Sequence, residues 1–234
     1  TEGKMIFLSG PRQVGKTTIL KKLFPQAQYL TVDNENTKAV LERYDISSYR
    51  SLLLPSTKIL VIDEIHLLKN PGRAAKIFFD QIPEVKLIIT GSSAFNIKNK
   101  AAESLAGRKI DYHLFPLSLG KYLTQTKIIP DLFLPVLRHS DFPQERVYPF
   151  DMKGITNFAL QYGLYPAAIT HPEKEVYLRN LVDSVVFRDL MELSLIENRP
   201  AALNLLRLLA FQIGGLVNIN ELAGKLQLDA KTVR

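Results

Sequence analysis

The 234-residue chain has no cysteine. It can therefore form neither a disulfide framework nor a thiolate metal site, and a reducing cytoplasm is the expected location. No apolar run approaches the roughly 18 residues that a membrane-spanning helix needs, so no membrane partner is expected. Internal repeats and low-complexity tracts are also lacking. These absences leave a globular protein whose chemistry depends on oxygen and nitrogen side chains.

The composition is that of an ordinary globular protein, with 46% hydrophobic and 23% charged residues. The length is sufficient for a sizeable core and for one or two domains. Lysine and arginine outnumber aspartate and glutamate by 30 to 23, which gives a formal net charge of +7. This excess permits a nucleic-acid partner, but it fits a merely basic, well-solvated surface equally well.

The clearest motif is a phosphate-binding loop, Gly10-Pro-Arg-Gln-Val-Gly15-Lys16-Thr17, in the pattern G-x-x-x-x-G-K-[ST]. Its glycines let successive backbone N–H groups point at one centre, and a following helix adds the positive end of its dipole. Lys16 is expected to reach the β- and γ-phosphates of ATP, and the Thr17 hydroxyl to bind Mg²⁺. Apolar residues 5–8 predict a strand before the loop, and residues 18–24 predict a helix after it. The residues predicted to contact ATP are Gly10, Pro11, Arg12, Gln13, Val14, Gly15, Lys16, Thr17 and Thr18.

A second nucleotide motif is the aliphatic run at residues 58–62, which ends in Asp63 and Glu64. Asp63 can hold the hydration shell of Mg²⁺ against Thr17. Glu64 can orient or deprotonate the attacking water, which favours hydrolysis over simple nucleotide binding. One predicted strand, residues 28–32, separates the two motifs in sequence. This spacing suits the P-loop proteins in which a further strand lies between the phosphate-loop strand and the acidic strand.

Five β runs alternate with helical segments, at residues 5–8, 28–32, 58–62, 85–90 and 110–115. They predict an α/β fold, a P-loop NTPase three-layer sandwich with a parallel five-stranded sheet covered by helices on both faces. Helical pieces are expected over 39–54, broken by Asp45, and over 71–82, with Pro71 in the first turn. Ligands of such sheets bind at the carboxyl ends of the strands. Residues 10–17, 63–64 and 90–93 are therefore predicted to converge on one site.

Four further side chains are considered for the site, each with a plainer alternative. Ser92 is the favoured hydroxyl of the run Thr90–Ser93 for sensing the γ-phosphate, although small residues also suit a simple turn. Arg108 is a candidate to stabilise the transferring phosphate, or else a surface arginine. Arg12 either contacts the nucleotide or points away from it. His66 is interpreted as a loop or packing histidine in preference to a catalytic one.

The position of Arg108 suggests a homo-oligomer. Arg108 precedes the fifth predicted strand, so it is expected near the amino end of that strand, opposite the nucleotide. A neighbouring subunit packed head-to-tail could present the guanidinium to the site in trans. A planar, permanently charged guanidinium suits phosphate oxygens better than an ammonium group does.

The alternation of strand and helix patterns ends in the second half of the chain. Four prolines between residues 130 and 149 indicate a connector, and no strand pattern is clear from residue 154 onward. Helical spacing is seen over 174–196 and 201–213. Residues 218–234 have the sequence pattern of a helix-turn-helix, with Asn220 and Asp229 expected to cap two short helices. Lys231 and Arg234 would face outward, either toward duplex DNA or on a protein-docking element.

Together these motifs resemble the AAA-type ATPases of the archaeal and bacterial family that carries a C-terminal domain of unknown function. The resemblance implies a phosphate loop at residues 10–17, Asp63 for Mg²⁺, Glu64 for water, a first sensor near Ser92 and Arg108 as an arginine finger. It also implies a small helical region after the core, followed by a winged helix. The chain departs from the family at Lys121, where an acidic residue is common. The matching motifs are Gly-Pro-Arg-Gln-Val-Gly-Lys-Thr-Thr at 10–18, Val-Ile-Asp-Glu-Ile-His at 61–66, Ile-Ile-Thr-Gly-Ser-Ser at 88–93, Leu-Ala-Gly-Arg at 105–108, Phe-Pro-Leu-Ser at 115–118, Gly-Leu-Tyr-Pro at 163–166, Tyr-Leu-Arg-Asn at 177–180 and Phe-Arg-Asp-Leu at 187–190.

The expected organisation is a P-loop AAA-like core at 1–127, a connector at 128–153, a helical lid region at 154–199 and a partial winged helix at 200–234. The predicted function is Mg²⁺-dependent ATP hydrolysis as a conformational switch, coupled to DNA or a protein client. A slow, nucleotide-gated DNA-binding or sensor module would use the same site and remains the alternative. A DExH-type helicase needs a second core domain, a small-molecule kinase does not need Glu64, and a GTPase needs an Asn-Lys-x-Asp motif that this chain lacks.

Overall fold

The computed structural model describes residues 3–91, 105, 107–126, 151–184 and 198–233. Contacts within the chain divide it into two compact units, residues 1–174 and 175–234, and each is described by itself. The domain boundaries expected at 127, 153 and 199 stay predictions.

The first unit is built on a five-stranded sheet in which every pair of neighbouring strands is parallel. The strand order is β2-β3-β4-β1-β5. The α/β fold with a parallel five-stranded sheet is thus confirmed. The strands are β1 (Met5–Ser9), β2 (Gln28–Thr31), β3 (Ile59–Asp63), β4 (Lys86–Gly91) and β5 (Lys109–His113).

One detail of the expected topology is corrected by this order. A strand does lie between the phosphate-loop strand β1 and the acidic strand β3, but it is β4 and not β2. The strand at residues 28–31, which separates the two motifs in sequence, pairs with β3 on its other side, at the edge of the sheet. Order along a sheet depends on how helical crossovers pack, and spacing in the sequence does not reveal it.

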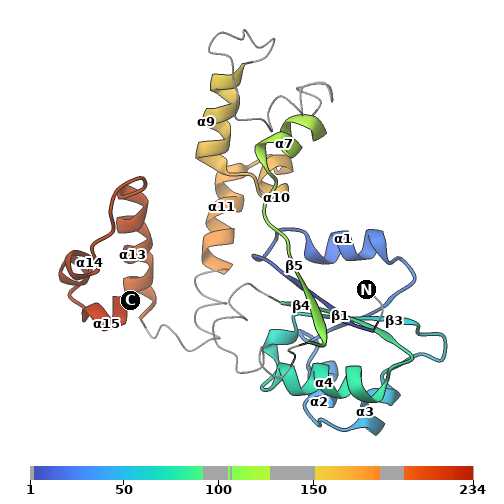
Figure 1. Cartoon of the computed structure of the whole chain (residues 1–234). Helices are drawn as coiled ribbons and strands as arrows, with labels where there is room; N and C mark the ends of the chain where they lie inside the picture. The colour runs from blue at the N-terminus through green and yellow to red at the C-terminus, as the bar shows by residue number, and fades with distance from the viewer. Residues whose placement is uncertain (1–2, 92–104, 106, 127–150, 185–197, 234) are drawn as a thin grey trace. The chain divides into compact units, whose positions relative to one another are not determined.

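Helices cover both faces of the sheet, which makes three layers (Figure 1). On one face, Leu20 of α1 packs with Leu8, Val61 and Ile88. The strand residues next to these in sequence turn to the opposite face, because side chains alternate along a strand. The helices of the first 81 residues are α1 (Lys16–Leu23), α2 (Glu35–Leu41), α3 (Ile46–Ser51), the 3₁₀ turn η1 (Ile65–Leu67) and α4 (Pro71–Gln81).

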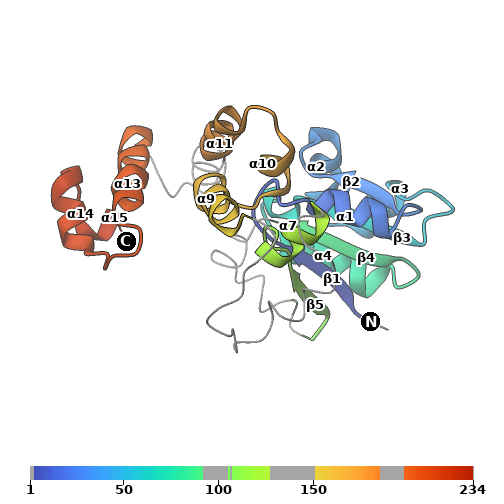
Figure 2. The same ribbon diagram turned by 90° about the horizontal axis from the view of Figure 1, so that it is seen from above.

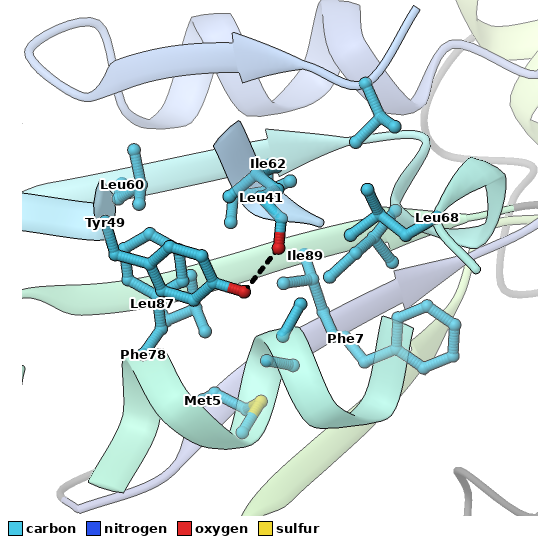
Figure 3. Packing of buried hydrophobic residues seen from close by; sticks show 14 of the residues in the cluster. Met5, Phe7, Leu41, Tyr49, Leu60, Ile62, Leu68, Phe78, Leu87 and Ile89 are labelled. Carbon is cyan, nitrogen blue, oxygen red and sulfur yellow. Dashed lines mark hydrogen bonds between the residues drawn. The ribbon is translucent and has the colours of Figure 1, made fainter. Parts of the chain in front are cut away.

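The larger core lies under α2, α3 and α4 (Figure 3). Tyr49 of α3 is fully buried and stacks on Phe78 of α4, with ring centroids 4.5 Å apart. Its hydroxyl donates a hydrogen bond of 2.7 Å to the carbonyl of Leu41 at the end of α2. The polar tip of this buried side chain is therefore satisfied, and one residue fixes three helices against the sheet. Full burial of a large apolar side chain contributes about 1.5–3 kcal/mol.

The expected break at Asp45 is where α2 and α3 separate. The Asp45 carboxylate caps α3 by accepting a hydrogen bond of 2.8 Å from the backbone N–H of Ser48. Asn70 caps α4 in the same way, and Pro71 takes the first helical position, as expected.

Past the sheet, the first unit continues with α7 (Leu119–Gln125), α9 (Met152–Tyr162) and α10 (Pro166–Thr170). These helices lie side by side (Figure 2). They share a small apolar cluster in which Tyr122 stacks on Phe158, with ring centroids 5.6 Å apart. The backbone N–H of Leu117 donates to the carbonyl of Leu164 at 2.9 Å. The segment leaving β5 is therefore tied directly to the helical region that was expected after the core.

Helix α11 (Lys174–Asp183) begins where the first unit ends. It covers the start of the helix expected over 174–196, and residues 185–196 of that expectation lie outside the described residues.

The second unit continues with α13 (Arg199–Phe211), α14 (Ile219–Leu226) and α15 (Ala230–Val233). Asn218, and not Asn220, caps α14, because its side chain accepts hydrogen bonds from the N–H groups of Asn220 and Glu221. Lys231 on α15 is exposed, and Arg234 lies outside the described residues.

Candidate nucleotide site

The phosphate loop connects β1 to α1, and its two glycines are required by its shape. Gly10 has φ 155°, and a Cβ at this position would lie 2.3 Å from the carbonyl oxygen of Leu114. Gly15 has φ 97° and stands at the N-cap of α1. Side chains rarely adopt either conformation, and the close approach at Gly10 leaves no room for one. The loop therefore holds its turn because hydrogen is the only side chain that fits at Gly10.

Lys16 lies inside this turn. Its side chain is buried, and its Nζ donates hydrogen bonds of 3.0 Å to the carbonyl of Gly10 and 3.1 Å to that of Pro11. The ammonium group is thus held against the loop's own backbone, at the first residue of α1. Because the N-terminus of a helix already favours anions, a positive charge placed there strengthens the attraction for phosphate.

Three side chains join the carboxyl ends of the central strands. The Thr17 hydroxyl donates to Oδ2 of Asp63 at 2.6 Å. The Thr90 hydroxyl donates a short hydrogen bond to Oδ1 of Asp63 and accepts one of 3.1 Å from the backbone N–H of Glu64. Both oxygens of Asp63 are therefore held by hydroxyl groups, one from α1 and one from β4. Thr17, Asp63, Glu64 and Thr90 thus lie together as predicted. Residues 92 and 93 of the predicted convergence lie outside the described residues.

The oxygen atoms of Thr17 and Asp63 suit Mg²⁺ as ligands. Within the described parts of the chain, no three His, Cys, Asp or Glu side chains gather into a metal site. Mg²⁺ is commonly bound by one or two protein oxygens together with phosphate oxygens and water, and it needs no cage of protein ligands. A threonine hydroxyl and a carboxylate already in contact are a donor set of this kind.

Glu64 turns away from the strand immediately after Asp63. Its backbone has left-handed angles, φ 57° and ψ 41°, and the 3₁₀ turn η1 follows. Burial raises the pKa of its carboxyl group, and the nearby positive charges of Lys16 and Arg12 oppose that increase. Arg12 therefore acts on this carboxyl group through its charge. The negative charges of Asp63 and Asp33 add to the increase in this pKa, so Glu64 lies in a largely buried setting with charges of both signs.

His66 lies against Glu64. Its Nδ1 is 3.2 Å from Oε2 of Glu64, and its side chain is only 8% exposed. Burial first, and then the charges of Arg12 and Lys16, lower the pKa of His66 to about 4. The imidazole is therefore neutral near pH 7. The interpretation of His66 as a buried packing residue accounts for its burial but not for this contact.

The hydroxyl that contacts the acidic strand is Thr90, which the sequence did not single out. Ser92, the favoured candidate, lies outside the described residues. In the sheet Ile62 is aligned with Ile89, so the next residue of each strand brings Asp63 beside Thr90. The register of β3 against β4 is the signal that would have selected Thr90 from its neighbours.

Arg108 lies far along the sheet from the phosphate loop. It directly precedes β5, and its carbonyl accepts a hydrogen bond of 2.9 Å from the N–H of Met5 at the start of β1. Its Nε donates to Oδ1 of Asp80 at 2.9 Å, and both side chains are about one-third exposed. Arg108 is thus at the amino end of the strands, while the phosphate loop is at their carboxyl end.

Comparison with known proteins places these features in a family. A family model for an AAA domain matches residues 2–123, and a model for a domain of unknown function (DUF8612) matches residues 155–234. An uncharacterized protein of Haemophilus influenzae is 22% identical over 237 residues, which cover 94% of this chain and 54% of the relative. An uncharacterized protein of Mycobacterium tuberculosis is 28% identical over 105 residues, which cover 44% of this chain and 23% of the relative. The chain thus spans about half or less of the length of these curated relatives.

Among solved structures, PCH-2 of C. elegans aligns with a TM-score of 0.41 and 15% identity, covering 79% of this chain and 60% of that one. Within the described ranges, no helix is both long and apolar enough to cross a membrane. The AAA-domain model spans 122 of the 234 residues, and its span contains the phosphate loop, Asp63, Glu64 and Thr90. The chain therefore belongs to the AAA domain family, here with a C-terminal domain of unknown function.

Proposed function

We propose that this protein binds ATP with Mg²⁺ at the loop Gly10–Thr17 and hydrolyses it, and that it acts as a conformational switch. The observation that carries this proposal is the hydrogen bond of 2.6 Å between Thr17 and Asp63. It joins the phosphate loop to the acidic strand at the point where a nucleotide-bound cation would be shared. Membership of the AAA domain family supports nucleotide binding in general.

Binding and hydrolysis depend on different residues. Lys16 and the N-terminus of α1 attract the phosphates, while Thr17 and Asp63 would hold Mg²⁺. Mg²⁺, when held by Thr17 and Asp63, would supply positive charge that offsets the negative charge of the phosphates. Glu64 stands next to this pair, and its buried carboxylate accepts a proton more readily than an exposed one, which suits a general base for water.

The C-terminal helices are the second part of the proposal, which assigns them the binding of DNA. The two short helices α14 and α15 support the predicted helix-turn-helix, with Leu222 and Ala223 of α14 buried and Lys231 of α15 exposed. We include weak, largely sequence-independent binding of duplex DNA in the proposal. Lys231→Glu should weaken this binding and reduce its salt dependence by about one unit of slope. Unchanged affinity and slope would make the segment a protein-docking element.

Nucleotide binding is tested with Lys16→Ala and a matched control, Lys22→Ala. Lys22 is an exposed lysine on the same helix, so its removal changes the net charge equally without touching the loop. Calorimetric titration with ATP and Mg²⁺ should give affinity for the wild type and Lys22→Ala, and at least about tenfold weaker affinity for Lys16→Ala. Equal affinity in all three proteins would contradict the assignment of the loop.

The slow-turnover alternative shares this site and differs in rate. A nucleotide-gated sensor would bind ATP in the same titration but release it mostly unhydrolysed. Steady-state ATP turnover, measured with and without duplex DNA, separates the two functions.

A further inference from the structure

The order of the strands determines on which side of the phosphate loop the base of a nucleotide would lie. Asp63 and Thr90 belong to β3 and β4, which lie on one side of β1, whereas β5 lies on the other side. If hydrolysis takes place at Asp63 and Glu64, the terminal phosphate faces these two residues. The base is at the opposite end of the triphosphate chain, and it is therefore expected on the side of β5.

The segment that leaves β5 is fixed against the phosphate loop. The backbone N–H of Leu114 donates a hydrogen bond of 2.8 Å to the carbonyl of Ser9. The carbonyl oxygen of Leu114 is the atom that a Cβ on Gly10 would approach to 2.3 Å. Three residues further on, the N–H of Leu117 donates to the carbonyl of Leu164. The segment, which Figure 1 shows between β5 and α7, is thus held by the loop at one end and by the helical region at the other.

Phe115 lies in this segment and presents its ring to solvent, because the residue is 69% exposed. The ring packs against the imidazole of His113, with centroids 4.2 Å apart and planes tilted by 57°. The hydroxyl of Ser9, the residue before Gly10, lies 2.9 Å from Nδ1 of His113. The aromatic ring is therefore connected to the start of the phosphate loop through two side chains, and much of its surface is open.

We propose that the ring of Phe115 is a platform on which the adenine base of ATP stacks. This inference rests on the proposed binding of ATP at the loop Gly10–Thr17, whose residues account for the phosphates and Mg²⁺ only. Stacking a base on an aromatic side chain removes two apolar surfaces from water and brings their π-systems into contact. Because His113 already supports the ring, little freedom of the side chain is lost when the base binds.

Calorimetric titration separates the contacts of the base from those of the phosphates. ATP and inorganic tripolyphosphate, each with Mg²⁺, share a triphosphate chain and differ in the nucleoside. Phe115→Ala should bind ATP at least about fivefold more weakly than the wild type and bind tripolyphosphate equally well. Phe211→Ala, which removes another exposed phenylalanine at the end of α13, should bind both ligands as the wild type does. Wild-type ATP affinity in Phe115→Ala, or an equal loss for both ligands, would overturn the platform.

A spectroscopic test uses the absence of tryptophan from the chain, because Phe115→Trp introduces a single indole fluorophore at the platform. ATP should change the emission of this indole by stacking on it, and tripolyphosphate should leave the emission nearly unchanged. The variant should also bind ATP within about threefold of the wild type, since it keeps an aromatic face. The same change of emission with both ligands, or an ATP affinity as low as that of Phe115→Ala, would overturn the platform.

These readouts do not depend on turnover, so the platform and the proposed hydrolysis can fail separately. A loss in Phe115→Ala that is specific to ATP, in a protein that does not hydrolyse ATP, would overturn the hydrolysis and support the platform. Turnover by the wild type together with unchanged ATP affinity in Phe115→Ala would overturn the platform and leave the hydrolysis intact. Failure of the wild type to bind either ligand would overturn both.

Discussion

At the scale of single residues, the site is a chain of short polar contacts with Asp63 at its centre. Thr17 and Thr90 donate to its two oxygens, and Thr90 also accepts from the backbone of Glu64. A hydrogen bond to a charged group contributes about 1.5–3 kcal/mol, so these contacts fix the acidic strand end firmly. The geometry of the site is thus set before any ligand arrives.

The buried, neutral state of His66 predicts a pH-dependent stability. Its pKa in the folded protein is about 4, below the ordinary 6.5 that it regains on unfolding. Between these values the unfolded state binds more protons, so the free energy of unfolding falls as pH drops from about 6.5 to about 4 and then levels off. At roughly 1.4 kcal/mol per pKa unit, the full effect is about 3.5 kcal/mol.

Denaturant titrations of the wild type and His66→Asn at pH 7.5 and pH 5 measure this difference. The wild type should lose more stability than the variant on acidification, since every other titrating group is common to both. Equal losses in the two proteins would mean that the imidazole is not held neutral in the folded state.

Some site residues could be predicted from the sequence and others could not. Lys16, Thr17 and Asp63 follow from the motif spacing, and the structure brings Thr17 and Asp63 into contact. Selecting Thr90 over Ser92 needs the register of β3 against β4, which arises from tertiary packing. The contact of His66 with Glu64 depends on a left-handed residue, and a motif does not reveal backbone angles.

At the scale of elements, alternating strands and helices predicted a parallel sheet, and the sheet is there. The order of its strands could not be predicted from the sequence, because it depends on how the helical crossovers pack against the sheet. Helix starts were partly predictable. Asp45 marks the break between α2 and α3 as expected, whereas Asn218 takes the capping role expected of Asn220, one of two nearby asparagines.

The turn between β1 and α1 leads to a prediction about Gly10. Alanine there would need φ near 155° and would place its Cβ 2.3 Å from the carbonyl oxygen of Leu114. Strained backbone alone costs of order 1–3 kcal/mol, and the clash forces the loop to move. Gly10→Ala should therefore lower both the melting temperature and the affinity for ATP.

The matched control is Gly224→Ala in α14, where a Cβ would meet nothing within 4 Å. Alanine is the better helix former, so this variant should melt at or slightly above the wild-type temperature. Wild-type stability and nucleotide affinity in Gly10→Ala would show that the close approach to Leu114 is not needed.

At the scale of the whole molecule, we propose that Arg108 acts on the nucleotide of a neighbouring subunit, because it is separated from the phosphate loop of its own subunit. Arg108 and the loop lie at opposite ends of parallel strands, so a subunit cannot easily bring its own Arg108 to its own nucleotide. The ion pair with Asp80 is about one-third exposed on both sides, and such pairs contribute only about 0–1 kcal/mol. A phosphate of the nucleotide bound to a neighbouring subunit could therefore replace Asp80 as the partner of Arg108 with little loss of free energy.

This arrangement predicts recovery of activity on mixing two impaired proteins, Arg108→Ala and Glu64→Gln. In a mixed assembly some interfaces combine an intact Glu64 site with an intact Arg108 from the neighbour. Turnover of the mixture should exceed the sum of the two separate proteins and rise with total concentration. A mixture no more active than that sum, with specific activity independent of concentration, would leave Arg108 as a surface residue paired with Asp80.

Hydrolysis at the site centred on Asp63 and Glu64 is tested most directly by ATP binding and turnover in Glu64→Gln. The substitution keeps the size of the side chain and removes its basic carboxylate. General-base catalysis contributes about 10²–10⁴-fold, so turnover should fall by at least about 100-fold while affinity for ATP with Mg²⁺ stays within about threefold. Wild-type turnover in Glu64→Gln would contradict the role of Glu64 as the base and require another group to activate the water.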